Sequence, residues 1–591
     1  MIKLITIILL ISSLSAKSGK TGSDNINITA EEIRDHIQFL SSDKLKGRHP
    51  GTAGYKKAVQ YIEKNWKQSG LLPAGNKHYK QLFEFADGIS ISGYNRFKIN
   101  ETKQTFRVKK DYMPLGFSGT GKTDASVVFV GYGFSVEDSV SWNDYKNINV
   151  KDRWVLVFRG SPDGSSPHSA YADYSAMRKK YIGARDNGAI GILFVNRFDD
   201  EDQNELTALH FSRSSNQDRI AALHISQEIA EQLLADGVSL KQLQISIDDN
   251  KTTASFETGF SVSTQIGLRE KSVKGINVVG LLPGDGSTKE LVVIGAHMDH
   301  LGFGGGESGS LKPDVHAIHN GADDNASGVT GLLELAEKLG SIPGALKRGL
   351  LFIAFDAEEK GLIGSKYFVN NPTVEFDNVT AMVNMDMVGR MKESSLSVGG
   401  TGTSPLFEPL LDSLKIIHNL KLSYNRGGYG PSDHSSFYAK KSPVLFFFTG
   451  SHEDYHKPTD DWEKINVEGE KQVLDLVYDV VVTLSNQEEK PLFTESGSKE
   501  RASGRRSFKV SMGVIPSYTS SGRGFAIDGV RPDGPAANAG MVGGDAILEI
   551  NGKEVRDIYD YMSRLGELKK GQEVSVLIQR GDKLVSLLLK L

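Results

Sequence analysis

The sequence predicts an α/β fold in which helices flank a mixed sheet. Short buried strands are indicated by three apolar runs, LVVIGAH, LLFIAFDAEE and TAMVNMD, each of which leads to a histidine or an acid. A helix between the first two runs is predicted to place Glu334 on its outer side and to have an apolar face made of Val329, Leu332, Leu333, Ala336 and Leu339. Because the carboxyl ends of strands in an open α/β sheet meet at one crevice, the polar residues there are expected to form a site.

Length and composition predict several domains. The chain has 591 residues, more than one hydrophobic core usually holds. Its hydrophobic fraction of 39% and charged fraction of 24% are ordinary for globular proteins. A net charge of -4 leaves no basic excess to neutralise phosphates, so nucleic acid is not an expected partner.

Residues 1–16 have the pattern of a signal peptide. Lys3 precedes the apolar run LITIILLI, and the small residues SSLSA fit cleavage near Ala16. An amphipathic starting helix is the alternative interpretation. The apolar run is too short for a permanent membrane anchor, so the protein is expected to be secreted or periplasmic. It contains no cysteine, so stability has to come from core burial and bound metal rather than from disulfides.

Residues 25–108 are predicted to form the first part of the main domain. Thr29 and Glu32 have the spacing of a capping box, and Ile33, Ile37 and Leu40 then fall on one helical face. After the turn-rich segment GRHPGTAGY, a second amphipathic helix is indicated by Ala58, Tyr61, Ile62 and Trp66.

Residues 109–262 change in character and are interpreted as an inserted domain. Short strands are indicated by ASVVFVGYGF, WVLVFRGSP and AIGILFVN, with a helix between the last two. This order resembles a protease-associated domain, and an unrelated β-rich insertion would also explain it. The run INVVGLLPG then resumes the main sheet as a predicted edge or hairpin strand, and residues 263–486 are interpreted as the catalytic part.

Candidate metal ligands lie in five short motifs, GAHMDHLG, NGADDNASG, AFDAEEKG, VNMDMVG and EDYHKPTD. Each motif supplies one or two carboxylates or imidazoles from a separate segment of the chain. These groups suit zinc, and a carboxylate can bridge two ions that lie about 3.5 to 4 Å apart. The set therefore indicates a site for two divalent metals.

The ordered motifs, together with GGYGPSDHSSF, resemble the co-catalytic di-zinc aminopeptidase family, which includes relatives of glutamate carboxypeptidase and glutaminyl cyclase. The resemblance covers roughly residues 265 to 485. It implies two Zn²⁺ per chain, for which Co²⁺ or Mn²⁺ could substitute. The implied ligands are a bridging Asp324, His297 and Asp386 for one ion, and Glu359 and His456 for the other.

The same resemblance implies roles for residues beside the metals. Glu358 would be the general base, Asp299 would hydrogen-bond the His297 imidazole, and Tyr429 would donate to the oxyanion. Asp433 and His434 would line the pocket. Asp323 is interpreted mainly as a structural turn residue.

The expected activity is hydrolysis of the amino-terminal peptide bond of peptides by a hydroxide held between the two metals, that is, a zinc metalloprotease of the aminopeptidase type. A metallocarboxypeptidase or a glutaminyl cyclase of the same family remains an alternative. A further alternative is a scaffold protein that has no catalytic activity and uses its accessory domains for binding.

Residues 487–506 are polar and are interpreted as a linker, and residues 507–591 resemble a PDZ domain of the bacterial protease type through GPAANAGM and GGDAILEINGKEV. The resemblance implies capture of a C-terminal peptide by the loop formed by Gly522, Arg523, Gly524 and Phe525. The peptide itself is expected to add as an edge strand. Docking against the catalytic domain, or capping of the enzyme, are the alternatives.

Overall fold

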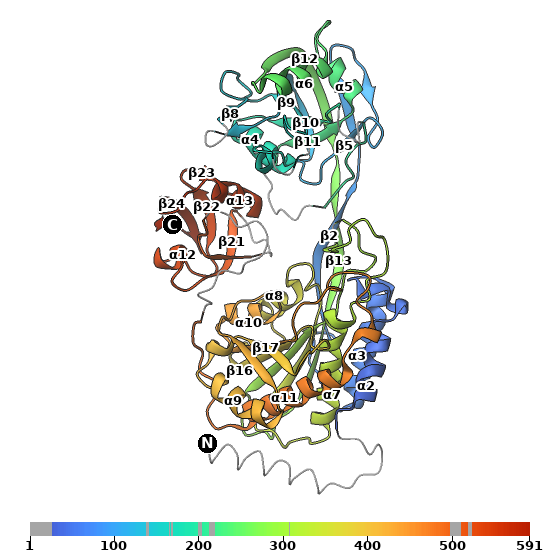
Figure 1. The fold of residues 1–591 in the computed structure, drawn as a ribbon, viewed down its shortest axis with the longest axis vertical. Coiled ribbons are helices and arrows are strands. Elements are labelled where there is room, and N and C mark those ends of the chain that lie inside the picture. Colours follow the sequence, from blue (N-terminus) through green and yellow to red (C-terminus); the bar gives the residue numbers. More distant parts are fainter. Residues whose placement is uncertain are drawn as a thin grey trace.

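The computed structural model describes residues 27–591 except 137–140, 165, 167–168, 199–203, 212–218, 307, 497–509 and 518–522. The predicted signal peptide lies outside the described residues. Figure 1 shows a main domain, an inserted domain joined to it by a two-stranded arm, and a C-terminal domain beside the arm. Within the described part of the chain, none of the helices has the length and apolarity needed to cross a membrane.

The main domain is built on a nine-stranded mixed sheet, which confirms the predicted fold class. Its strand order is β1-β13-β15-β14-β16-β19-β17-β18, and β2 also pairs with β13. The neighbours β15, β14, β16 and β19 are parallel, so their carboxyl ends meet at one edge. The strands are β1 (Leu72–Pro73), β2 (Lys80–Ile91), β13 (Leu268–Leu282), β14 (Leu291–His297), β15 (Gly349–Phe355), β16 (Val379–Met385), β17 (Ser395–Gly399), β18 (Lys421–Asn425) and β19 (Val444–Phe448).

Helices cover both faces of this sheet (Figure 1). One face carries α2 (Ala30–Leu40), α3 (Ala53–Gln68), α7 (Gly328–Gly340), α9 (Phe407–Ile417) and α11 (Val467–Asn486), whose apolar residues share one core. The other face carries α8 (Ile363–Asn370) and α10 (His434–Ala439) over a second core. Short 3-10 turns lie at η1 (Asp43–Arg48), η4 (Phe376–Asn378), η5 (Thr401–Thr403) and η6 (Trp462–Lys464).

The predicted helix patterns are confirmed with one exception. The Thr29 hydroxyl caps α2 by accepting from the backbone N–H of Glu32, and Ile33, Ile37 and Leu40 are buried. The apolar residues predicted for α7 are also buried. The prediction that Glu334 lies on the outer side of this helix is wrong. Helices α2, α3 and α11 pack around α7 and leave the Glu334 side chain 3% exposed.

The inserted domain begins earlier than predicted. Residues 96–106, assigned above to the main domain, form β3 (Arg96–Ile99) and β4 (Thr105–Phe106) and pair with the inserted sheet through β12. The sheet has the order β4-β3-β12-β6-β9-β10-β11-β5. Its other strands are β5 (Tyr112–Pro114), β6 (Gly121–Val130), β9 (Trp154–Phe158), β10 (Gly191–Val195), β11 (Ala221–Ile225) and β12 (Ser255–Ile266).

A small hairpin and three helices complete the inserted domain. The hairpin is β7 (Ser135–Val136) with β8 (Trp142–Asn143), and the helices are α4 (Met177–Asp186), α5 (Gln227–Gln232) and α6 (Leu240–Asn250), with a short turn at η2 (Ala172–Tyr174). The antiparallel pair β2 and β13 forms the arm to the main domain. Since β13 also pairs with β15, it is not an edge strand of the main sheet.

The C-terminal domain has a six-stranded sheet of its own. Its elements are β20 (Val514–Pro516), β21 (Phe525–Val530), α12 (Pro535–Asn538), β22 (Ala546–Ile550), β23 (Lys553–Glu554), α13 (Ile558–Gly566), β24 (Glu573–Arg580) and β25 (Lys583–Lys590). Strand β21 pairs with β20 on one side and β22 on the other. Strand β20 therefore covers the part of β21 from Ile527 to Val530.

The first residues of the predicted linker pack against the main domain. Phe493 lies against Tyr438 with ring centroids 5.5 Å apart, and the Ser496 N–H donates to the Tyr438 hydroxyl at 2.8 Å. Gly522 and residues 497–506 lie outside the described residues.

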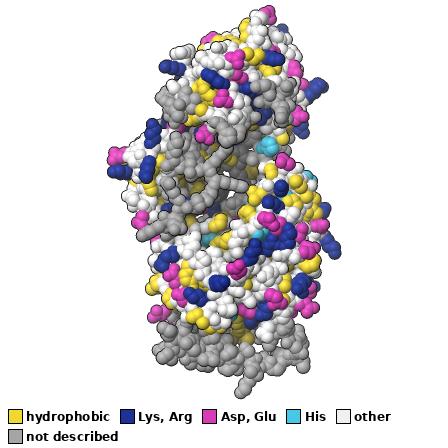
Figure 2. All heavy atoms as spheres, in the orientation of Figure 1, with side chains coloured by type: hydrophobic (Ala, Val, Ile, Leu, Met, Phe, Trp, Pro, Cys, Tyr) yellow, Lys and Arg dark blue, Asp and Glu magenta, His cyan; other side chains and the backbone are white. Residues whose placement is uncertain are grey.

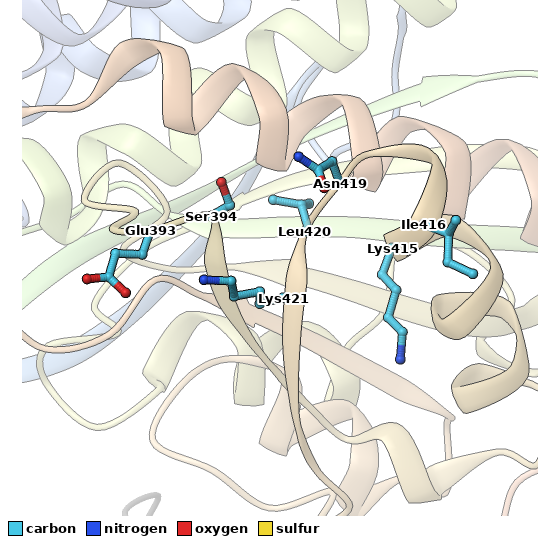
Figure 3. A pocket seen from close by; sticks show the side chains of 7 residues that line it. All are labelled: Glu393, Ser394, Lys415, Ile416, Asn419, Leu420 and Lys421. Carbon is cyan, nitrogen blue, oxygen red and sulfur yellow. The ribbon is translucent and has the colours of Figure 1, made fainter.

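The surface of the main domain carries charges of both signs and includes a cavity. Figure 2 shows basic and acidic side chains interspersed over the visible face. The cavity, about 620 Å³ in volume, lies where β17 and β18 begin and is lined by Glu393, Ser394, Lys415, Ile416, Asn419 and Lys421, among others (Figure 3). Its lining includes none of the predicted site residues.

Candidate metal centre

The parallel strands deliver the predicted ligands to one edge of the main sheet. His297 is the last residue of β14, and Asp386 follows the last residue of β16 directly. Glu359 lies four residues after the end of β15, which is hydrogen-bonded beside β14. His456 comes from the loop after β19. Sequence segments that are far apart therefore meet at one point.

Asp324 lies at the centre of the cluster and faces an imidazole with each of its carboxylate oxygens. Its Oδ1 is 3.3 Å from His297 Nε2, and its Oδ2 is 3.2 Å from His456 Nε2. The turn Ala322–Ser327 that holds it precedes α7 directly. The N–H groups of Asp323 and Asp324 both donate to Asp460 Oδ2, at 3.0 and 3.1 Å, and this fixes the turn.

The other predicted ligands complete two groups around this shared carboxylate. On one side, Asp386 Oδ1 lies 3.4 Å from His297 Nε2. On the other side, Glu359 Oε2 lies 3.1 Å from His456 Nε2. Donor atoms of His297, Asp324 and Asp386 lie within 4.8 Å of one another, as do those of His300, Asp324 and Glu359. The oxygen and imidazole donors suit zinc, and Asp324 belongs to both groups.

Burial and close charges shift the pKa values of these groups. Burial lowers the pKa of His297, but the carboxylates of Asp386 and Glu358 outweigh it and hold the pKa well above its ordinary value. Burial opposes ionised Asp324 as well, yet the surrounding imidazoles of His297, His456 and His300 keep its pKa well below the ordinary value. The metal-free cluster therefore contains ionised carboxylates paired with protonated imidazoles.

Glu358 lies beside the cluster on a partly open side. Its Oε2 is 3.8 Å from His297 Nε2, and its side chain is 12% exposed. Burial is the main cause that raises its pKa well above the ordinary value, and Asp386 and Glu359 add to it against the opposing effect of His297. A carboxylate with a raised pKa at the edge of such a cluster is suited to accept a proton.

Asp299 contacts the cluster through both its main chain and its carboxylate. The nearest acceptor to His297 Nδ1 is the backbone carbonyl of Asp299 at 3.2 Å, whereas its Oδ1 is 3.8 Å away. The Asp299 carboxylate instead accepts from the backbone N–H of Glu358 at 3.0 Å. Asp299 therefore holds the segment that carries Glu358, while its main chain faces the imidazole.

Tyr429 lies at a domain interface rather than among the ligands. Its hydroxyl donates to the backbone carbonyl of Asp528 in β21 at 3.2 Å, and its ring packs edge-on against Tyr438 at 4.7 Å. Burial raises the pKa of Tyr429 well above its ordinary value, and Tyr438, Asp528 and Glu495 add to this effect. The predicted oxyanion donor is thus engaged by the C-terminal domain.

The remaining sequence candidates have mixed placements. Asp323 is fully buried and accepts from the N–H of Gly389 at 2.7 Å, as a structural turn residue would. Asp433 is also buried, and burial raises its pKa to about 7, with Asp299 and Asp386 adding to the effect against His297. The His434 ring stacks on Phe446 at 4.4 Å.

Two residues near the cluster were not predicted from the sequence. His300 Nδ1 lies 2.7 Å from Glu359 Oε1, so this imidazole braces the carboxylate. The Tyr455 ring stacks on His456, with ring centroids 3.9 Å apart. Burial raises the pKa of Tyr455, and the charges of Asp324 and Glu359 raise it further. Both residues lie within the motifs given above. His300 follows the predicted ligand His297 by three residues, and Tyr455 directly precedes His456, so proximity to a predicted ligand in the sequence could have indicated them.

Arg48 is a third unpredicted contributor, from the GRHPGTAGY segment. Its guanidinium is fully buried and donates to backbone carbonyls of both loops that carry ligands: Met298 at 2.9 Å, Asn320 at 2.6 Å and Gly321 at 2.9 Å. Burial lowers the pKa of Arg48 to about 10, and the charges of Asp324 and Asp299 have the largest opposing effects. One buried cation thus links the His297 loop to the Asp324 turn.

Comparison with known proteins agrees with this geometry. Residues 277–481 match Peptidase family M28, and residues 510–591 match the PDZ domain. Aminopeptidase YwaD of Bacillus subtilis (strain 168) is 31% identical over 239 residues, which cover 38% of this chain and 48% of that protein. Probable lipoprotein aminopeptidase LpqL of Mycobacterium tuberculosis is 24% identical over 374 residues, which cover 63% of this chain and 60% of that protein.

Among solved structures, an aminopeptidase from Aneurinibacillus sp. strain AM-1 aligns with 23% identity and a TM-score of 0.47, over 81% of this chain and 98% of that one. The chain spans about half to three fifths of the length of the two curated relatives. The resemblance drawn from the sequence motifs is confirmed. Residues 277–481 of this chain are therefore similar to peptidase family M28, and residues 510–591 are similar to a PDZ domain.

Proposed function

We propose that this chain is an exported, zinc-dependent aminopeptidase that hydrolyses the amino-terminal peptide bond of peptides. The observation that carries the proposal is the shared position of Asp324 between His297 and His456. One carboxylate that faces two ligand groups is what a pair of divalent ions requires. The two curated relatives described above are both named aminopeptidases, which supports the choice of substrate end.

The residues divide into two ligand sets. His297 and Asp386 would hold one ion, Glu359 and His456 the other, and Asp324 would contact both. Two zinc ions bound here would lower the pKa of a water molecule to about 7 and polarise the carbonyl of a substrate. His300 and Arg48 would keep the ligand carboxylate and the ligand loops in place.

Glu358 is the proposed proton acceptor and donor. It lies next to a ligand, its carboxylate contacts the cluster at 3.8 Å, and part of its surface is open to solvent. From there it can accept a proton from the attacking water and return it to the leaving amine. The Asp299 carboxylate supports this role because it fixes the backbone N–H of Glu358.

Export and peptide capture are further parts of the proposal. The signal-peptide pattern of residues 1–16 supports a secreted or periplasmic location. The PDZ domain supports binding of a C-terminal peptide ligand, and β20, which ends the strand order of its sheet among the described residues, is the strand to which such a peptide would add.

The test is a panel of aminoacyl chromogenic substrates with and without a metal chelator. We expect hydrolysis that the chelator abolishes and added zinc restores. The same substrates with an acetylated amino terminus should not be cleaved. Cleavage of acetylated peptides from the carboxyl end would instead support the carboxypeptidase alternative, and bound zinc without any turnover would support a scaffold.

A further inference from the structure

The PDZ domain is docked on the inserted domain through a charged interface. The two facing elements are α4 of the inserted domain and α13 of the PDZ domain (Figure 1). Three cross-domain ion pairs join them: Arg178 to Asp557 at 2.7 Å, Arg185 to Asp560 at 3.0 Å, and Arg564 to Asp186 at 2.7 Å. The inserted domain supplies two of the three cations and the PDZ domain the third, so each side contributes both charges to the interface.

This interface is buried and includes apolar contact. The side chains of Arg185 and Asp560 are 7% and 1% exposed. Tyr559 packs against the apolar cluster of the inserted domain, and the Arg178 guanidinium lies 4.4 Å above its ring. Such buried, geometrically matched pairs distinguish a specific interface from a chance surface contact.

The other side of the PDZ domain touches the main domain at Tyr429. Asp528 accepts a hydrogen bond from the Tyr429 hydroxyl through its carbonyl, and its carboxylate pairs with Lys366 of α8 at 2.9 Å. Gly529 lies so close that a Cβ added there would be 1.8 Å from the Tyr429 hydroxyl oxygen. The PDZ domain thus spans from the inserted domain to the loop that carries Tyr429.

A phenol has one O–H group, and here it is directed to Asp528. The same proton cannot stabilise an oxyanion at the metal centre. We propose that docking of the PDZ domain on α4 restrains Tyr429 and keeps the enzyme in a low-activity state, and that undocking releases this residue for catalysis. The inference rests on the proposed peptidase function and adds an interface of this chain that controls it.

Two substitutions on the inserted domain test the docking surface. Arg185→Glu places an acid against Asp560, and Asp186→Lys places a cation against Arg564. The second variant is suited to fold, since Asp186 ends α4, where a cation stabilises the helix. Arg153→Glu is the matched control, because Arg153 pairs with Glu257 inside the inserted domain.

Docking is measured separately from activity. The chain has no cysteine, so Lys44→Cys in the main domain and Lys583→Cys in the PDZ domain, both at exposed positions, can carry two spin labels. Distances between the labels are measured in each variant with zinc present. We expect Arg185→Glu and Asp186→Lys to broaden and lengthen the distance distribution, and the control to leave it unchanged. Unchanged distances in both variants would overturn the proposed interface.

Activity is then compared on a short chromogenic substrate. We expect undocking to raise kcat by about tenfold or more, since one oxyanion donor is worth about 100-fold to 1000-fold in kcat. Tyr429→Phe should cancel this gain in the undocked variant and cost much less in the docked protein. If the domains separate but kcat stays unchanged or falls, the inference that docking restrains Tyr429 is overturned, and the peptidase proposal is not affected. Zinc-loaded protein without turnover in every variant would overturn the peptidase proposal together with it.

Discussion

The guanidinium of Arg48 donates to the backbone carbonyl of Gly321 at 2.9 Å, which ties the amino-terminal segment to the turn that holds Asp324. The two residues are separated by 273 positions in the sequence. Because the same side chain also reaches Met298, the positions of both ligand loops depend on one buried cation.

Arg48→Met should therefore damage both stability and metal binding. The substitution leaves several buried carbonyls without a donor, and hydrogen bonds to charged groups are worth about 1.5 to 3 kcal/mol each. We expect the free energy of unfolding to fall by about 3 kcal/mol or more, and zinc affinity to fall by about 10-fold to 100-fold. Urea unfolding and a competitive zinc titration measure these. Arg34→Met, at an exposed position of α2, is the control, and equal behaviour of the two variants would refute the anchoring role.

Glu358→Gln should separate chemistry from metal binding. The amide keeps the shape of the side chain but cannot accept the proton, so we expect kcat to fall by about 100-fold to 10,000-fold. Zinc content, measured by mass spectrometry, should stay at two equivalents because Glu358 is not a proposed ligand. The exposed Glu337→Gln on α7 serves as the control. Near-normal turnover of Glu358→Gln would show that another group moves the proton.

Asp324→Asn and Asp323→Asn form a matched pair at adjacent positions. Asp324 faces both imidazoles, so its amide variant should lose at least one of the two zinc equivalents. Asp323 supports the main chain of Gly389, so its variant should keep the zinc while its free energy of unfolding falls by about 1 to 3 kcal/mol. Zinc content and thermal unfolding of each variant decide between these outcomes. A reversed pattern would exchange the roles of the two acids.

Zinc binding should release protons near neutral pH. In the metal-free protein the Glu359 and Asp324 carboxylates outweigh burial and raise the pKa of His456 to about 11, and the pKa of His297 is raised as well. Both imidazoles are therefore protonated at pH 7, whereas a metal binds the neutral form. Affinity for zinc should fall as the pH falls. Calorimetry in buffers of different ionisation enthalpy should show about two protons released per chain, and zero release would contradict the charge state inferred for the cluster.

The sequence was sufficient for the convergence of the ligands but not for what surrounds them. His297 and Asp386 could be placed because each follows an apolar strand, and parallel strands end at a common edge. Glu334 was misjudged because a periodic pattern shows one apolar face and cannot reveal how many neighbours cover the helix. Arg48 was missed because its partners are backbone carbonyls, which leave no residue signature.

The accessory regions show a similar limit. The start of the inserted sheet at Arg96 depends on pairing with β12, which is distant in the sequence. The position of Tyr429 depends on how the PDZ domain docks, and no local pattern encodes that. The predicted contact between the Asp299 carboxylate and His297 is long, at 3.8 Å, and the sequence did not indicate that the backbone carbonyl of Asp299 would lie closer.

The most direct test of the central claim is a crystal structure of the zinc-loaded protein with anomalous scattering recorded at the zinc edge. The account predicts two anomalous peaks about 3.5 to 4 Å apart, one beside His297 and Asp386, the other beside Glu359 and His456, with Asp324 between them. A single peak, or peaks away from Asp324, would contradict the paired metal centre and the hydrolytic function built on it.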